Sequence, residues 1–230
     1  MNVATPSPRV RVRRLSKRGY YDRATLYGVL DAGFICHAGY VIDGQPYVTP
    51  TAYWREGDQL YWHGSSASRM LRAQTPGIPV CITVTHLDGL VVARSGFHHS
   101  INYRSAILFG ESEKVEDKAE KEAAMTAFVE RIYPGRWRTL RPVTVQELKA
   151  TSVLRMTIDE AAAKIRTGPP VDDEEDYALP IWAGVINLST VAGKIEPDQR
   201  LSAGIPIPED VYPYASSGAF DKILSRAAPK

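Results

Sequence analysis

The sequence predicts a mainly β protein with some α structure: a six-stranded antiparallel barrel of Greek-key type with a few peripheral helices. Six β-like runs lie between residues 34 and 115, with little helical pattern among them. Turn signals such as Asp43-Gly44 and Asp88-Gly89 separate neighbouring runs, which is typical of hairpins. The clearest helical pattern follows these strands. Many short strands joined by hairpins favour a small closed or partly closed barrel.

The elements are expected in the following order. Helical spacing of apolar residues predicts helices at 22–30, 66–73, 117–132 and 143–149. Strands are expected at 34–42, 45–54, 59–63, 80–86, 90–95 and 103–115, with a last strand at 152–158. We divide the chain into a basic N-terminal arm (1–18), a barrel with its helices (19–160) and a C-terminal extension (161–230). The extension is expected to pack on the barrel or on a partner subunit.

Composition limits the class of protein. The chain has 230 residues, of which 44% are hydrophobic and 23% charged, as in an ordinary globular protein. No run approaches the roughly 18 apolar residues of a membrane helix, so we expect no membrane contact. The first 14 residues lack the apolar stretch of a secretory signal, and Cys36 and Cys81 lie in apolar runs that favour buried free thiols. We therefore predict a cytoplasmic protein.

The basic arm has two interpretations. Seven arginines and lysines fall between Arg9 and Arg23, although the net charge of the chain is only +2. Such an arm could bind nucleic acid. It could instead pack on an acidic neighbour or reach a ligand phosphate. We favour the second interpretation, because no aromatic stacking platform or nucleic-acid motif accompanies the arginines.

The segment from Leu60 to Met70 carries the most chemical information. A strand ends, Gly64 turns the chain, and serines precede a helix with Arg69 in its first turn. Free backbone N–H groups at a helix start, serine hydroxyls and a guanidinium are suitable donors for a phosphate. Taken alone, the pattern favours a plain serine N-cap beside a surface arginine, because serine-rich helix starts are common.

The order of five short stretches resembles that of the pyridoxamine 5′-phosphate oxidase-like flavoproteins, within the branch that includes the nitroimidazole-resistance reductases. The resemblance spans about residues 20 to 208 and is carried by the stretches at 21–34, 46–50, 60–69, 103–110 and 182–186. No single stretch is specific, and the assignment depends on their order.

This resemblance implies a split-barrel homodimer with two FMN sites at the subunit interface. One expected strand would lie along the isoalloxazine ring through Val48, Thr49, Pro50 and Thr51. The ribityl chain and phosphate would be held by Trp62, His63, Gly64, Ser65, Ser68 and Arg69. Tyr103 and Ser105 are further flavin contacts, and Trp182 is either a lid over the partner's flavin or a core anchor. The family often has a lysine directly after the arginine, where this chain has Met70.

The implied function is an FMN-dependent oxidoreductase of unknown substrate, because the flavin carries the redox chemistry. No residue pattern identifies a catalytic acid or base. The alternatives are a non-catalytic flavin- or haem-binding module and, less favoured, a nucleic-acid-binding regulator. We expect no metal site: His98 and His99 are adjacent, and no carboxylate or third histidine lies near them in the sequence.

Overall fold

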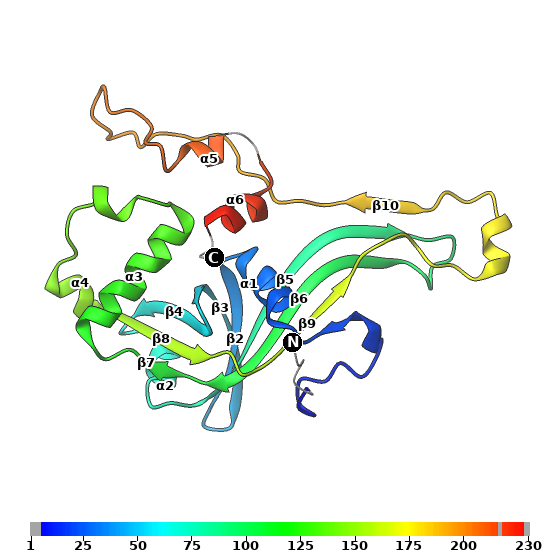
Figure 1. Cartoon of the computed structure of the whole chain (residues 1–230), viewed down its shortest axis with the longest axis horizontal. Helices are drawn as coiled ribbons and strands as arrows, with labels where there is room; N and C mark the ends of the chain where they lie inside the picture. Colours follow the sequence, from blue (N-terminus) through cyan, green and yellow to red (C-terminus); the bar gives the residue numbers. More distant parts are fainter. Residues whose placement is uncertain (1–5, 216–217, 228–230) are drawn as a thin grey trace.

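The structure, a computed structural model, describes residues 6–215 and 218–227. Within these residues, ten antiparallel strands form one curled half-barrel sheet with a few helices around it (Figure 1). The strand order is β1-β9-β6-β5-β2-β3-β4-β8-β7, and β10 pairs with the free part of β5. The strands are β1 (Gly19–Tyr20), β2 (Ile35–Ile42), β3 (Gln45–Glu56), β4 (Gln59–Ser65), β5 (Pro79–Val92), β6 (Ser100–Glu111), β7 (Glu113–Lys114), β8 (Thr151–Thr157), β9 (Glu160–Arg166) and β10 (Gly184–Asn187).

The expected number of six strands was therefore wrong, although the mainly β, antiparallel architecture is confirmed. The two expected strands around Asp88-Gly89 are one continuous strand, β5, with a register shift between Leu87 and Gly89. Asp88-Gly89 is therefore a bulge rather than a hairpin turn, and the Asp88 carboxylate accepts hydrogen bonds from Nε and Nη2 of Arg104 on the paired strand. The true turn follows Val92, so β5 and β6 form a long hairpin.

Sequence periodicity missed β9 and β10. The β9 segment begins Glu160-Ala-Ala-Ala, a composition poor in the β-branched residues that mark strands. It nevertheless pairs with β6 along its whole length, from Tyr103↔Arg166 to Phe109↔Glu160. The sheet thus continues beyond residue 160, where the expected barrel ended. Strand β10 pairs with β5 at the outer end of the hairpin.

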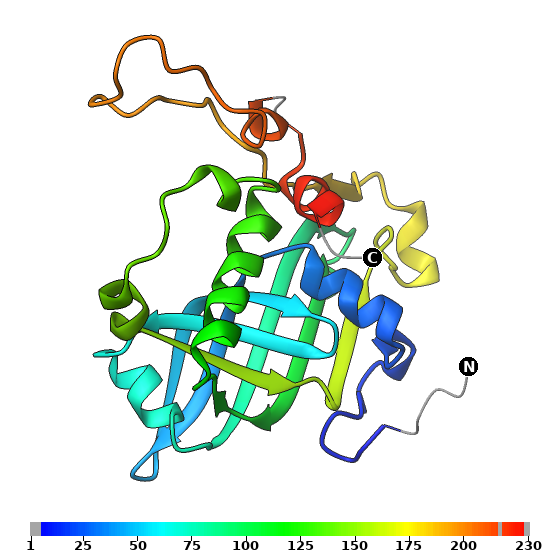
Figure 2. The same cartoon turned by 60° about the vertical axis from the view of Figure 1, so that its left-hand side comes forward.

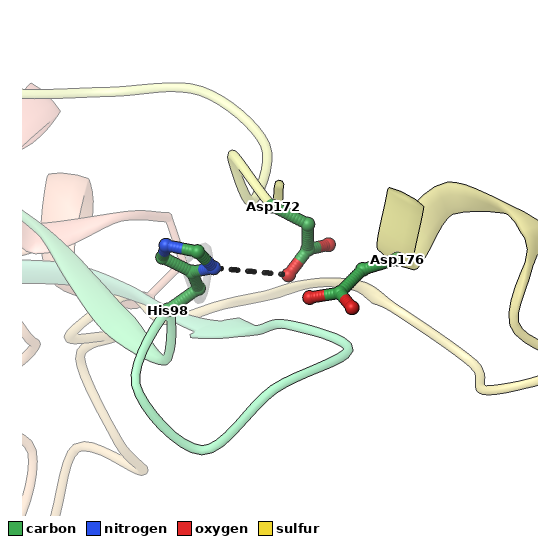
Figure 3. Close-up of side chains that lie close together, drawn as sticks. All are labelled: His98, Asp172 and Asp176. Carbon is green, nitrogen blue, oxygen red and sulfur yellow. Dashed lines mark ion pairs between the residues drawn. The ribbon is translucent and has the colours of Figure 1, made fainter. Parts of the chain in front are cut away.

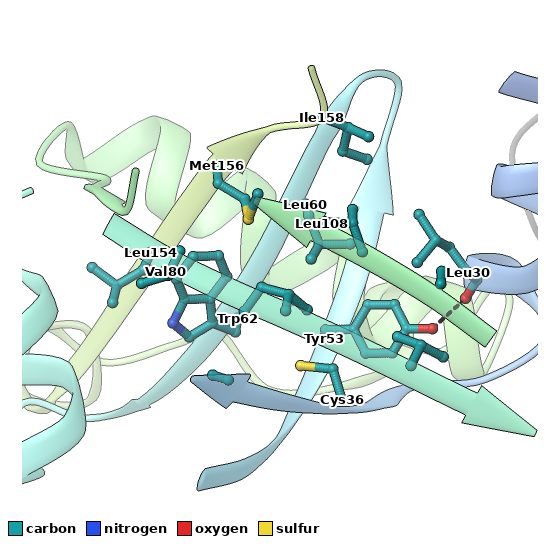
Figure 4. Packing of buried hydrophobic residues seen from close by; sticks show 14 of the residues in the cluster. Leu30, Cys36, Tyr53, Leu60, Trp62, Val80, Leu108, Leu154, Met156 and Ile158 are labelled. Atoms are coloured by element: carbon teal, nitrogen blue, oxygen red, sulfur yellow. Dashed lines mark hydrogen bonds between the residues drawn. The ribbon is translucent and has the colours of Figure 1, made fainter. Parts of the chain in front are cut away.

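Two apolar clusters lie on opposite sides of β3 and β4. The larger one fills the barrel and includes the buried rings of Tyr53 and Trp62 (Figure 4). The smaller one contains Trp54 and Phe128 and is covered by helix α3 (Lys118–Ile132), which crosses β4 and β8 in Figure 2. Neighbouring residues of β3 therefore enter different clusters, as strand alternation requires.

Helices α1 (Arg23–Asp31) and α3 begin where their capping residues predicted. The Asp22 side chain accepts a hydrogen bond from Thr25 N at the start of α1, and Asp117 caps α3 in the same way. The remaining helices are α2 (Arg69–Gln74), α4 (Val145–Ala150), α5 (Tyr212–Ala215) and α6 (Phe220–Ala227), with short 3-10 turns η1 (Ser16–Arg18), η2 (Trp137–Thr139) and η3 (Glu174–Ala178). Among the described residues, no helix is both long and apolar enough to cross a lipid bilayer.

Described segments near both termini pack on the rest of the molecule. In the N-terminal arm, whose first five residues lie outside the described part, Arg9 pairs with Glu160 and stacks over the Phe109 ring. One arginine of the arm thus packs on an acidic neighbour. In the C-terminal region α6 buries Leu224 near α1 and α3. The β5–β6 hairpin and β10 extend as an arm from the rest of the molecule (Figure 1).

Candidate functional site

The loop between β4 and α2 presents hydrogen-bond donors without protein partners. The Ser65 hydroxyl accepts a bond from Ala67 N at 3.2 Å. The hydroxyls of Ser66 and Ser68 have no partner in the described part of the chain, and Ser68 does not use its side chain to cap α2. A Cβ at Gly64 would lie 3.2 Å from a methyl group of Leu71, so the strand end approaches α2 closely. The loop therefore offers free donors on a fixed backbone.

Two guanidinium groups stand beside this loop. The exposed Arg69 lies over the Tyr47 ring at 4.7 Å and has no carboxylate partner among the described residues. Arg72, one turn further on, donates from Nε to Ser66 O at 3.3 Å. Met70 points the other way into the barrel core, so it could not be replaced by a charged side chain at little cost. Sequence reasoning missed Arg72, whose spacing of three residues from Arg69 was the available signal.

The predicted ring-binding residues of β3 divide between the two faces of the strand. Val48 and Pro50 are exposed on the outer face, whereas Thr49 and Thr51 are half-buried. The Thr49 hydroxyl lies 3.1 Å from the hydroxyl of the buried Tyr40. Because side chains alternate along a strand, only Val48 and Pro50 can meet a planar ligand lying on the outer face. Thr49 and Thr51 could reach it only through their backbone groups.

Val48 and Pro50 belong to a broader exposed face of the sheet. On it, His37 of β2 lies between Pro50 and Thr83. Ile107 of β6 pairs with Thr83 and continues the face, and the predicted contacts Tyr103 and Ser105 follow on the same strand. Among the described residues, His37 is the histidine whose ring has neither a hydrogen bond nor a ring contact. We call this surface, formed by the outward residues of β2, β3, β5 and β6, the outer face.

Trp62 and His63 lie away from both the loop donors and the outer face. Trp62 is fully buried in the barrel and donates from Nε1 to Gln74 Oε1 at 2.9 Å. His63 projects to the opposite side, where its ring packs against Trp54 and Phe128. Its Nδ1 is buried without a partner, and burial lowers the pKa of the imidazole below its usual range. Both side chains therefore pack in the interior of the protein rather than at the proposed ligand surfaces.

Trp182 precedes β10 on the protruding arm and is mostly exposed. It packs closely on Gly184, where an added Cβ would lie 2.9 Å from the indole. In Figure 1 the β10 arm and α2 stand at opposite ends of the molecule. Trp182 therefore does not join the loop donors within one chain.

A further pocket of about 350 Å³ lies beside α6 and was not foreseen. His86, Arg104 and Phe220 line it. The His86 ring is bonded to Val29 O, and Arg104 is neutralised by Asp88 and Asp221. His86 and Arg104 thus already have protein partners, unlike the donors at the β4–α2 loop.

Comparison with known proteins adds the following. A family model described as pyridoxamine 5′-phosphate oxidase matches residues 22–165. The solved structure of the flavocytochrome Anf3 from Azotobacter vinelandii is 46% identical, covers 91% of this chain and 97% of its own, and superposes with a TM-score of 0.87. For the FAD and haem binding protein from Mycobacterium smegmatis the identity is 38%, the coverage 88% and 98%, and the TM-score 0.84. A comparison with curated proteins gave no match.

Proposed function

Because this chain belongs to the pyridoxamine 5′-phosphate oxidase-like split-barrel family of flavin-binding proteins, we propose that it is a redox protein that binds a flavin nucleotide together with haem. The names of two solved proteins that are 46% and 38% identical over most of the chain support both cofactors. A bound flavin supplies one- or two-electron transfer and haem supplies one-electron transfer, while the protein binds and orients them.

The observation that carries the flavin proposal is the set of unpaired donors at the β4–α2 loop. Ser66, Ser68 and Arg69 have no acceptors in the described part of the chain, and Arg72 stands next to them. A flavin phosphate would supply oxygens for all four groups, and hydrogen bonds to charged groups are stronger than neutral ones. The flavin ring would then extend along the outer face past Val48 and Pro50.

The bound flavin could be FMN or FAD. The donors of the β4–α2 loop suffice for a single phosphate, which favours the FMN expected from the sequence. The mycobacterial protein is named for FAD, so FAD is the alternative. Release of the flavin by acid and separation by chromatography would distinguish the two.

His37 is the histidine that best fits an axial ligand of haem. Its imidazole is exposed on the outer face without a partner in the described residues, and the exposed apolar side chains of Ile35 and Val41 share this face of β2. The rings of His86, His98 and His99 are hydrogen-bonded, and that of His63 is enclosed by aromatic rings. We expect His37→Ala to lose the haem absorption band while retaining the flavin. Loss of haem on replacing another histidine instead would exclude this assignment.

We propose that the protein is a homodimer formed through the outer face. Ile35, Val41, Val48 and Ile107 expose large apolar surfaces there, and such patches mark interaction sites. A second copy would cover them and would also bring its own Trp182 arm to the neighbouring site. Dimers with twofold symmetry are the commonest oligomers. Ile107→Glu should shift the mass from light scattering from dimer to monomer, and a monomeric wild type would refute the proposal.

The flavin site is tested by Arg69→Ala. Removing one charge-assisted phosphate contact should weaken FMN or FAD binding by about 1.5–3 kcal/mol, or roughly ten- to a hundredfold. Riboflavin has no phosphate, so its affinity should be the same for the variant and the wild type. Equal nucleotide affinities would remove Arg69 from the site. A purified protein that contains no flavin and takes up none would refute the proposed function.

A further inference from the structure

The tip of the β5–β6 hairpin and the acidic segment at 172–176 meet at one point of the arm. His98 comes from the hairpin turn, and Asp172 and Asp176 come from the start of η3 and the residues before it (Figure 3). One ligand atom of each residue lies within 4.8 Å of those of the other two. These residues are 74 and 78 positions apart in the chain, so only the tertiary fold brings them together.

Asp172 is held in a fixed orientation. Its side chain is fully buried, and its two oxygens accept hydrogen bonds from Arg94 N at 2.9 Å and Arg94 Nη1 at 3.0 Å. The group is thus an oriented carboxylate of the kind that hydrogen-bonding partners around metal ligands produce.

The His98 ring faces this carboxylate. Its Nδ1 lies 3.8 Å from Asp172 Oδ1 and 3.2 Å from the Ser95 hydroxyl, and about a fifth of the side chain is exposed. A separation of 3.8 Å is too long for a direct hydrogen bond. It is compatible with two ligand atoms that share a cation, each at about 2.0–2.2 Å.

The local charge favours a cation. The acidic segment carries five carboxylates in succession, at Asp172, Asp173, Glu174, Glu175 and Asp176. Among the described residues, the cationic or protonatable groups paired with this segment are Arg94 and His98. Arg94 contributes one positive charge against the five carboxylates of the segment. Its guanidinium contacts only Oδ2 of Asp172. The segment therefore keeps an excess of negative charge around the three side chains.

We propose that His98, Asp172 and Asp176 bind a divalent transition-metal ion of the Zn²⁺ class, independently of any flavin or haem. An imidazole nitrogen with two carboxylates suits Zn²⁺, whereas Mg²⁺ and Ca²⁺ prefer sets of oxygen ligands. Three protein ligands leave a position for water. The bound ion fastens η3 and its loop to the hairpin tip and so fixes the base of the segment that carries Trp182.

Calorimetric titration of the chelator-washed holoprotein with ZnCl₂ tests this site. The wild type should bind one equivalent at micromolar concentrations. His98→Ala and Asp176→Asn should each weaken binding by about tenfold or more, because each removes one ligand. Asp172 is left unchanged, because its loss would also release Arg94. The flavin and haem spectra should be the same in both variants, which separates this site from the proposed function.

Two control variants distinguish coordination from general electrostatic attraction. His99→Ala removes a neighbouring imidazole that is bonded to Ser95 O, and Glu175→Gln removes a charge of the same segment. Neither residue belongs to the cluster, so both variants should bind Zn²⁺ like the wild type. The proposal is overturned if the wild type takes up no Zn²⁺ or if the two ligand variants bind Zn²⁺ like the wild type. It is also overturned if the control variants lose as much Zn²⁺ affinity as the ligand variants. The first or second result would leave an ion-pair clasp between His98 and Asp172.

Discussion

The buried ion cluster around Asp31 provides the sharpest test of how the barrel and its helices are held together. The Asp31 carboxylate at the end of α1 accepts two hydrogen bonds from Arg55 of β3, at 3.0 Å from Nε and 2.5 Å from Nη2. Arg131 of α3 donates to Asp31 O at 2.8 Å, and its Nη1 lies 3.6 Å from Oδ1. All three side chains are nearly inaccessible to water, so a single carboxylate faces two buried guanidinium groups.

Asp31→Ala should therefore lower the free energy of unfolding by about 3–5 kcal/mol, the cost of leaving a buried charge without its partner. A domain has only about 5–15 kcal/mol of stability, so the expected loss is a large share of it. By contrast, the exposed Lys114–Glu116 pair at 2.7 Å predicts a loss below about 1 kcal/mol for Glu116→Ala. Urea unfolding followed by circular dichroism at neutral pH gives both values.

A second variant separates unpaired charge from lost volume. In Asp31→Ala with Arg55→Met, one of the two stranded cations is replaced by an apolar chain of similar length. This double variant should be more stable than Asp31→Ala alone. A single variant that loses less than about 1 kcal/mol, like an exposed pair, would refute the reasoning.

Two further predictions concern glycines and histidines. Gly28→Ala should raise the free energy of unfolding by about 0.4–1 kcal/mol, because Gly28 lies within α1 and an added Cβ would meet nothing within 4 Å beyond its own stretch of helix. Gly33→Ala should lower it, because the same Cβ would lie 2.7 Å from the His86 ring. The folded-state pKa of His63 is lowered by burial, so the unfolded chain binds a proton first and stability should fall as pH drops below about 6.5. His63→Phe should make this decline shallower, and an unchanged slope in acid unfolding curves would show that His63 is not responsible.

The sequence allowed the family and the barrel to be predicted where local signals and tertiary structure agree. Asp43-Gly44 is the turn between β2 and β3, and Asp117 caps α3, as expected. The family assignment is confirmed, although no single stretch was specific. The order of the stretches carried the information, because each marks a different turn or strand of the same fold.

The arm could not be predicted, because a long-range contact decides its structure. Asp88-Gly89 has the composition of a hairpin turn, and locally nothing contradicts that interpretation. In the folded chain Arg104 binds Asp88. A Cβ added at Gly89 would lie 3.1 Å from the carbonyl oxygen of Ile186. Glycine is needed there for the close approach of β10 rather than for a turn.

The same error hid the candidate metal ligands. An early turn at Asp88-Gly89 would place His98 and His99 in a loop between two short strands, with no carboxylate nearby in the sequence. Once β5 continues to Val92, the turn moves outward and carries His98 to the tip of the arm. The pairing of β10 with β5 then folds the acidic segment back over that tip, where Asp172 meets Arg94 and His98. A ligand set that spans 74 to 78 residues thus depends on strand pairings, and its members carry no shared local pattern from which they could be recognised.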